Sequence, residues 1–146
     1  MSETKICVFS LSKKDPTFRR AVSIIGPINW LKGKIEYPHR YYFRKSVPSL
    51  PIGSKVLFSF DNQIFGEAII KEGVQTLTEK DEIPETFSGH YKKCITLDPG
   101  SIKIYRFHPT KSELMESDVF ADFRFSQLYS YLTLEQYKEI LRRAER

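Results

Sequence analysis

The stretch 50–72 constrains the fold more than any other part of this 146-residue chain. It opens with the turn residues 51–54 and continues as two β-rich runs, 56–60 and 64–70, on either side of Asp61-Asn62. Two such runs across a short polar turn are typical of a β-hairpin. Gly66 lies inside the second run, where a glycine indicates a bulge or a close approach of another backbone. The sequence therefore predicts a hairpin at the centre of a small β domain.

The two arms of this hairpin carry glycines, a lysine and apolar residues in a distinctive order. In that order they resemble the central hairpin of the PUA-like superfamily, in its EVE, YTH and ASCH branches. The resemblance implies an α+β domain in which a small, curled, mostly antiparallel β-barrel is flanked by two or three helices. The matching residues are Gly53, Lys55, Val56, Leu57, Phe58, Ile64, Gly66, Glu67 and Ala68.

The beginning of the chain resembles the same superfamily, so that the likeness spans roughly residues 5–72. A strand at 6–12, a helix at 16–22 and a Trp-bearing loop at 26–30 repeat the order seen in EVE and YTH domains. In YTH domains that loop contributes to an aromatic cage around a methylated base. The run 42–45 is similar to a stretch that precedes the hairpin in ASCH domains, although Tyr42 stands where those domains have Glu.

Local signals predict the remaining elements of one domain, residues 1–146. Asp15 and Pro16 mark a helix start, and Gly26-Pro27 marks its end. We expect strand 5–12 to be central and further strands at 91–97 and 102–107, with a short strand or extended segment around 120–125. A helical stretch is expected at 111–116. Thr133 and Gln136 form a capping-box pattern ahead of an amphipathic helix over 134–143. This gives five to seven strands and two or three helices.

The basic residues are concentrated in the first part of the chain. Residues 1–58 hold 11 Lys and Arg against 3 Asp and Glu, whereas residues 59–146 hold 12 against 15. Such a surplus suits a surface that faces phosphate groups. The alternative is a solvated basic face with no partner.

The stretch 29–45 interleaves aromatic and basic residues, a combination that suits nucleic acid because rings stack on bases and cations bind phosphates. The sole tryptophan, Trp30, is the predicted wall of a base pocket; the alternative is a core tryptophan. The predicted pocket residues are Trp30, Asn29, Ser10, Ser12, Tyr42 and Phe60. The predicted nucleic-acid backbone contacts are Lys32, Lys34, Arg40, Arg44, Lys45, Arg19 and Arg20.

No catalytic, metal or cofactor motif is recognisable in the sequence. We therefore expect no cofactor, no metal and no catalytic residue. Cys7 and Cys94 lie in apolar β-like runs and are interpreted as free buried thiols of a reducing compartment. With no apolar run of membrane-spanning length and no secretory leader, the chain is expected in the cytoplasm, away from membranes, as a monomer or weak dimer.

These observations favour a module that binds DNA or RNA and recognises a modified or flipped base. Two alternatives remain. Resemblance to ASCH-like amidohydrolases of acylated cytidine implies roles for Lys34 and Glu67, but Tyr37 stands where those enzymes have a nucleophilic Thr. The second alternative is an adaptor whose basic face binds an acidic protein.

Overall fold

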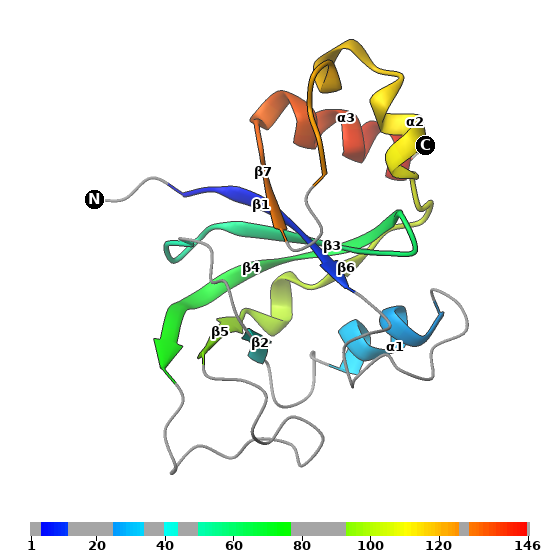
Figure 1. Ribbon diagram of the computed structural model, residues 1–146. Helices are drawn as coiled ribbons and strands as arrows, with labels where there is room; N and C mark the ends of the chain where they lie inside the picture. Colours follow the sequence, from blue (N-terminus) through cyan, green and yellow to red (C-terminus); the bar gives the residue numbers. More distant parts are fainter. Residues whose placement is uncertain are drawn as a thin grey trace.

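The computed structural model describes residues 4–11, 25–33, 40–43, 50–76, 93–125 and 129–145. Within these ranges the strands form one sheet in the order β2-β5-β4-β3-β1-β7, and β6 pairs with β4 (Figure 1). The strands are β1 (Ile6–Leu11), β2 (Arg40–Phe43), β3 (Lys55–Phe60), β4 (Gln63–Thr76), β5 (Lys93–Leu97), β6 (Lys103–Ile104) and β7 (Tyr129–Leu132). The helices are α1 (Ile25–Gly33), α2 (Lys111–Met115) and α3 (Leu134–Ala144), with short 3-10 turns η3 (Pro99–Ser101) and η4 (Asp118–Phe120).

The predicted hairpin is the β3–β4 pair. Asp61 and Asn62 connect the strands with positive φ angles of 51° and 61°, which are the angles of the two-residue turn that matches strand twist. Phe58 pairs with Gly66 and Ser59 with Ile64, so Phe65 is the extra residue of a bulge. The predicted irregularity next to Gly66 is confirmed.

Gly66 also sits where another backbone approaches closely. A Cβ atom at this position would lie 2.8 Å from the Lys103 carbonyl oxygen and 2.8 Å from Leu31 Cδ2. Residue 66 therefore has no room for a side chain between strand β6 and helix α1, which explains the glycine within a strand.

Strand β1 lies inside the sheet, as predicted. It runs parallel to β3 and antiparallel to β7, while β5 is antiparallel to both β4 and β2. Among the described residues no ladder joins β2 to β7, so the strand path is not closed there. The long strand β4 curves through the molecule and carries the curl of the sheet (Figure 1).

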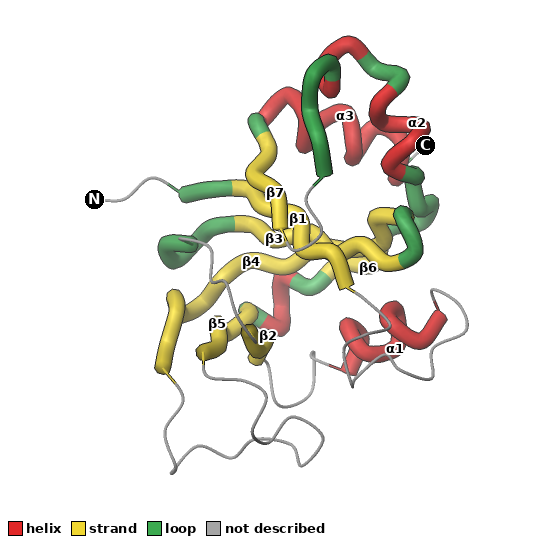
Figure 2. The backbone as a smooth tube through the Cα atoms, in the orientation of Figure 1, coloured by secondary structure: helices red, strands yellow, loops and turns green. Residues whose placement is uncertain are grey.

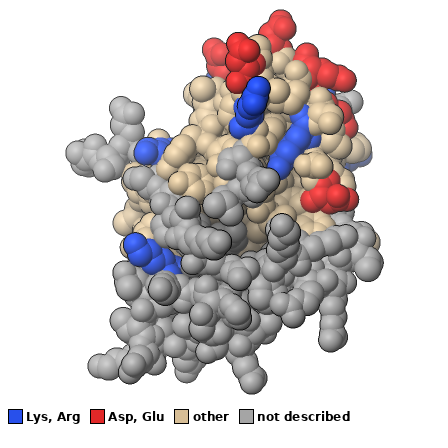
Figure 3. All heavy atoms as spheres, in the orientation of Figure 1, with Lys and Arg blue, Asp and Glu red and all other residues tan. Residues whose placement is uncertain are grey.

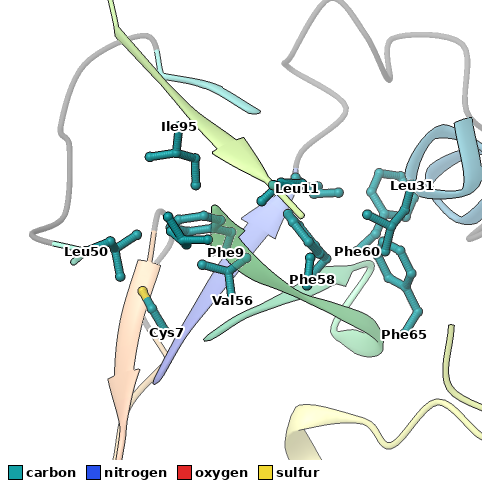
Figure 4. Close-up of a cluster of buried hydrophobic side chains, with 13 residues drawn as sticks. Cys7, Phe9, Leu11, Leu31, Leu50, Val56, Phe58, Phe60, Phe65 and Ile95 are labelled. Carbon is teal, nitrogen blue, oxygen red and sulfur yellow. The ribbon is translucent and has the colours of Figure 1, made fainter. Parts of the chain in front are cut away.

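Apolar side chains cover both faces of the sheet. Helices α2 and α3 lie on one side, and α1 lies on the other (Figure 2). The first core cluster, on the α1 side, is drawn in Figure 4 and consists of Cys7, Phe9, Leu11, Leu31, Leu50, Val56, Phe58, Phe60, Phe65, Ala68, Ile70, Ile95 and Leu97. The second core cluster, on the α3 side, consists of Val8, Leu57, Ile64, Tyr105, Leu114, Phe120, Leu132, Tyr137, Ile140 and Ala144.

Helix α3 follows its predicted pattern closely. Thr133 accepts a hydrogen bond from the Gln136 N–H, and the Gln136 side chain accepts one from the Thr133 N–H, which completes the capping box. Tyr137, Ile140 and Ala144 are buried against the sheet. The predicted helix at 111–116 is also found, as α2.

Three local predictions are wrong. The loop expected at 26–30 is part of helix α1, because Pro27 stands in the first turn, where a missing N–H costs no helical hydrogen bond. The strand expected at 102–107 is reduced to β6, preceded by η3, whose N-cap is Asp98. The segment 120–125 forms no strand: Phe120 ends η4, and the chain turns at Asp122, where φ is 63°. The helix expected at 16–22 lies outside the described residues.

Candidate nucleic-acid interface

Strands β1 and β3 are parallel, and their carboxyl ends lie side by side. We call this end of the two strands the edge, and several residues of the predicted site lie near it. Leu11 pairs with Phe60 in the last rung of the ladder, and Ser10 pairs with Ser59 in the rung before it. Because successive side chains of a strand point to opposite faces, Phe60 belongs to the first core cluster near α1. Ser10 points to the other face, toward Lys111.

Trp30 lies on helix α1 and packs, partly buried, against the first core cluster. Its ring meets the Phe58 ring edge to face, with centroids 5.6 Å apart and an interplanar angle of 79°. Such a pair adds about 0.5–1.5 kcal/mol to the burial of the rings. Asn29 and Lys32, on the same helix, are exposed. The core thus fixes the indole while part of it remains accessible.

The other predicted residues are distributed as follows. Phe60 is 2% exposed and belongs to the core. Arg40 and Tyr42 are residues of β2, whose backbone pairs with β5. Trp30 and Phe60 thus both adjoin the first core cluster, Asn29 and Lys32 are exposed on α1, and Ser10 points to the opposite face of the sheet. The predicted residues outside the described ranges are Ser12, Arg19, Arg20, Lys34, Arg44 and Lys45.

A second polar group occupies the α2 side of the same edge. The Lys111 ammonium donates a hydrogen bond to Ser10 Oγ at 3.0 Å and lies 5.3 Å from the centroid of the Phe125 ring. The Ser59 hydroxyl is 3.4 Å from Ser10 Oγ. Burial lowers the pKa of Lys111. Sequence reasoning missed Lys111 because it lies 101 positions from Ser10, and no local pattern connects them.

Glu67, which the ASCH resemblance singled out, is part of a buried polar network (the Glu67 network: Lys55, Glu67, Tyr105 and Tyr137). The hydroxyls of Tyr105 and Tyr137 both donate to Glu67 Oε1 at 2.8 Å. The Lys55 ammonium is 3.2 Å from Glu67 Oε2 and donates to the Tyr137 hydroxyl at 2.8 Å. Burial and the adjacent Glu67 carboxylate raise the pKa of Tyr105. The network joins the hairpin to α3 and to Tyr105, the residue after β6.

Most exposed acidic side chains of the described residues belong to α2, η4, α3 and their flanks, whereas Asp61 and Glu72 lie on the β3–β4 hairpin. In the view of Figure 3 most of the visible acidic side chains lie at the top, over α2 and α3, and one further group lies lower at the right. The exposed acidic residues of these helices and their flanks are Glu116, Asp118, Asp122, Glu135 and Glu145.

Other kinds of site find little support in the described part of the chain. No group of three or more potential metal ligands occurs there. Cys7 and Cys94 are both buried and in the thiol form, as predicted. None of the described helices has the length and apolar character needed to cross a membrane.

No family model matches this sequence, and no curated protein matches it. Solved structures do match in shape. The ASCH protein from Zymomonas mobilis is 15% identical, with a TM-score of 0.61 over 94% of this chain and 94% of that one. Protein Atu2648 from Agrobacterium tumefaciens is 12% identical, with a TM-score of 0.61 over 95% of this chain and 92% of its own.

A YTH domain shows the same architecture more distantly. This domain, from the MRB1 protein of Zygosaccharomyces rouxii, was solved in complex with N6-methyladenosine RNA. It is 13% identical, with a TM-score of 0.52 over 95% of this chain and 85% of its own. At such identities the likeness establishes the fold. The chain has the PUA-like fold that ASCH and YTH domains share.

Proposed function

We propose that this chain is a nucleic-acid-binding module that holds a flipped or modified base against Trp30. The observation that carries the proposal is the partly exposed indole, fixed by Phe58 on a helix that also presents Asn29 and Lys32. The fold supports it, because the YTH domain of the same architecture was solved with N6-methyladenosine RNA. The basic first part of the sequence supplies cations for the phosphates.

The energies suit this role. A base stacked on an aromatic ring gains about 1–3 kcal/mol, and burying one additional methyl group gains about 0.8 kcal/mol. A modified base is therefore expected to bind about fourfold more tightly than its unmodified form. Phosphate contacts would supply most of the affinity and make it depend on salt.

Trp30 is the sole tryptophan, so its fluorescence reports directly on the proposed contact. We would titrate the protein with single-stranded RNA and DNA of one sequence, each with adenine or N6-methyladenine at the centre. Binding is expected to quench the indole and to weaken as salt rises. By an anisotropy assay with labelled oligonucleotides, Trp30→Ala should lose about 5- to 150-fold in affinity.

Phe107→Ala is the matched control, because Phe107 is an aromatic residue that is 44% exposed outside α1 and both core clusters. Equal losses in the two variants would contradict a stacking role for Trp30. Absence of salt-dependent binding to every oligonucleotide would contradict the function itself. Comparing the affinities for the RNA and DNA oligonucleotides decides which nucleic acid the protein binds.

The alternatives receive less support from the described residues. Both carboxylate oxygens of Glu67 are already engaged, which disfavours its use as a general base. An adaptor protein would be favoured by an uncovered apolar patch on the C-terminal helix. Helix α3 instead buries most of its apolar face, although Leu134 is 58% exposed. The hydrolase hypothesis would be supported if the protein hydrolysed an acylated cytidine and if Glu67→Gln abolished that activity.

A further inference from the structure

Lys111 is a partly buried cation at the carboxyl edge of β1 and β3, outside the predicted base pocket. Within the described residues its partners are the Ser10 hydroxyl and the Phe125 ring, and no carboxylate forms an ion pair with it. An ammonium that loses water without gaining an anion is costly. Within the described residues no carboxylate offsets this cost for Lys111.

The pKa of Lys111 supports this description. Burial is the cause that lowers it, and no nearby carboxylate raises it again, although Glu113 and Glu116 lie on the same helix and its C-cap. A bound anion would supply the missing charge and bring the pKa back up.

The backbone holds Lys111 firmly against the hairpin tip. Its N–H donates to the Asn62 carbonyl at 2.9 Å, and the Ile64 N–H donates to the Pro109 carbonyl at 3.0 Å. Thr110 forms a bridge with Gln63 and caps α2. Because the segment is already fixed, little ordering is needed when a ligand binds.

We propose that Lys111 and Ser10, the latter first assigned to the base pocket, form a phosphate subsite for the nucleotide chain bound at this edge, with the buried Ser59 hydroxyl hydrogen-bonded to Ser10 behind them. This inference rests on the proposed function, and it adds a contact on the α2 side of the edge to the base contact at Trp30. The chemistry fits, since lysine binds phosphate as a compact point charge and serine hydroxyls are frequent phosphate ligands. The Phe125 ring restricts water on one side of the ammonium.

The main test compares salt dependence in matched variants. Lys111→Met removes the charge and keeps the apolar stem, and Lys111→Arg keeps the charge. Lys138→Met is the control, because Lys138 is an exposed lysine on α3. For single-stranded RNA, Lys111→Met should lose roughly tenfold in affinity at low salt and lower the slope of log K against log salt by about 0.7.

A second test uses the wild-type protein and does not depend on variant folding. Oligonucleotides carrying one neutral methylphosphonate at each position in turn should reveal one phosphate whose neutralisation weakens binding most. Neutralising that phosphate should cause no further loss of affinity in the Lys111→Met variant. Full affinity and an unchanged slope in Lys111→Met, beside normal binding by the wild type, would overturn the subsite and leave the proposed function intact.

Titration with inorganic phosphate and with adenosine monophosphate, followed by NMR shifts of Lys111, Ser10 and Phe125, separates the remaining cases. Shifts at these residues without oligonucleotide binding would keep the subsite, assign it to free nucleotide or phosphate, and contradict the proposed function. No shifts and no oligonucleotide binding would overturn both.

Discussion

The Lys55 ammonium lies 3.2 Å from the buried carboxylate of Glu67, across the β3–β4 hairpin. Glu67 Oε1 accepts hydrogen bonds from Tyr105 and from Tyr137 of α3. The Glu67 network thus fixes the C-terminal helix to the hairpin that the sequence first identified. Fully satisfied polar networks of this kind stabilise one arrangement of the elements that they join.

Glu67→Gln should destabilise the protein by about 2 kcal/mol, because it removes the charge that Lys55 and two tyrosine hydroxyls share. Urea unfolding measures the loss. Glu145→Gln is the matched control: Glu145 pairs with Lys103, but their side chains are 35% and 52% exposed, so its loss should stay below about 1 kcal/mol. Equal losses would show that burial adds nothing to the Glu67 network.

The sequence predicted this hairpin because its determinants are local. Asp61-Asn62 tolerate positive φ, and Gly66 needs no side-chain room. The network was beyond local reasoning, because Tyr137 is 70 positions from Glu67 and its pattern predicts only a helix face. Helix α1 was missed because Gly26-Pro27 is compatible both with the end of one helix and with the first turn of another.

Gly66→Ala should cost about 1–3 kcal/mol of stability, since the new methyl group would clash with the Lys103 carbonyl and Leu31 at 2.8 Å. Gly73→Ala is the control within the same strand. There the nearest atom, the Leu50 carbonyl oxygen, is 3.6 Å from the added Cβ, and the change should stay within about 0.5 kcal/mol. A similar effect of both substitutions on urea unfolding would contradict the packing argument.

The candidate site was only partly within reach of the sequence. Trp30 stood out as the sole indole beside basic residues, but its position on α1 against Phe58 became visible only with the fold. Lys111 follows an ordinary Pro109-Thr110 pair, and only the folded hairpin tip brings it to Ser10. Alternation along β1 already predicts that Ser10 points to the face opposite Phe9 and Leu11. That the carboxyl ends of β1 and β3 lie side by side could be seen only from the pairing of the two strands.

Neither thiol should react with a disulfide reagent in the native protein at about pH 8. Cys7 and Cys94 are 0% and 1% exposed, and burial raises the pKa of Cys7 to about 12, which leaves almost no thiolate. Spectrophotometric titration with dithionitrobenzoate should find no fast thiol in buffer and two in guanidinium. One fast thiol in buffer would show that the sheet opens locally.

The stability contributed by Glu139 should depend on pH in a defined direction. Hydrogen bonds from Arg142 and Arg143 lower the pKa of Glu139 from 4.5 to about 2. A lowered folded-state pKa means that the stabilisation is complete above pH 4.5 and is lost as the pH falls toward 2. The contribution should be small, because the Arg142 side chain is 66% exposed and solvent screens its charge.

Urea unfolding of the wild type and Glu139→Gln at about pH 7, 4 and 3 checks this expectation. The difference in unfolding free energy should be largest near pH 7, shrink by about pH 3, and fall at any pH when salt is raised. Glu116→Gln is the control, because Glu116 is exposed and forms no ion pair within the described residues. A difference that grows toward low pH would mean that the two arginines do not stabilise the charged carboxylate.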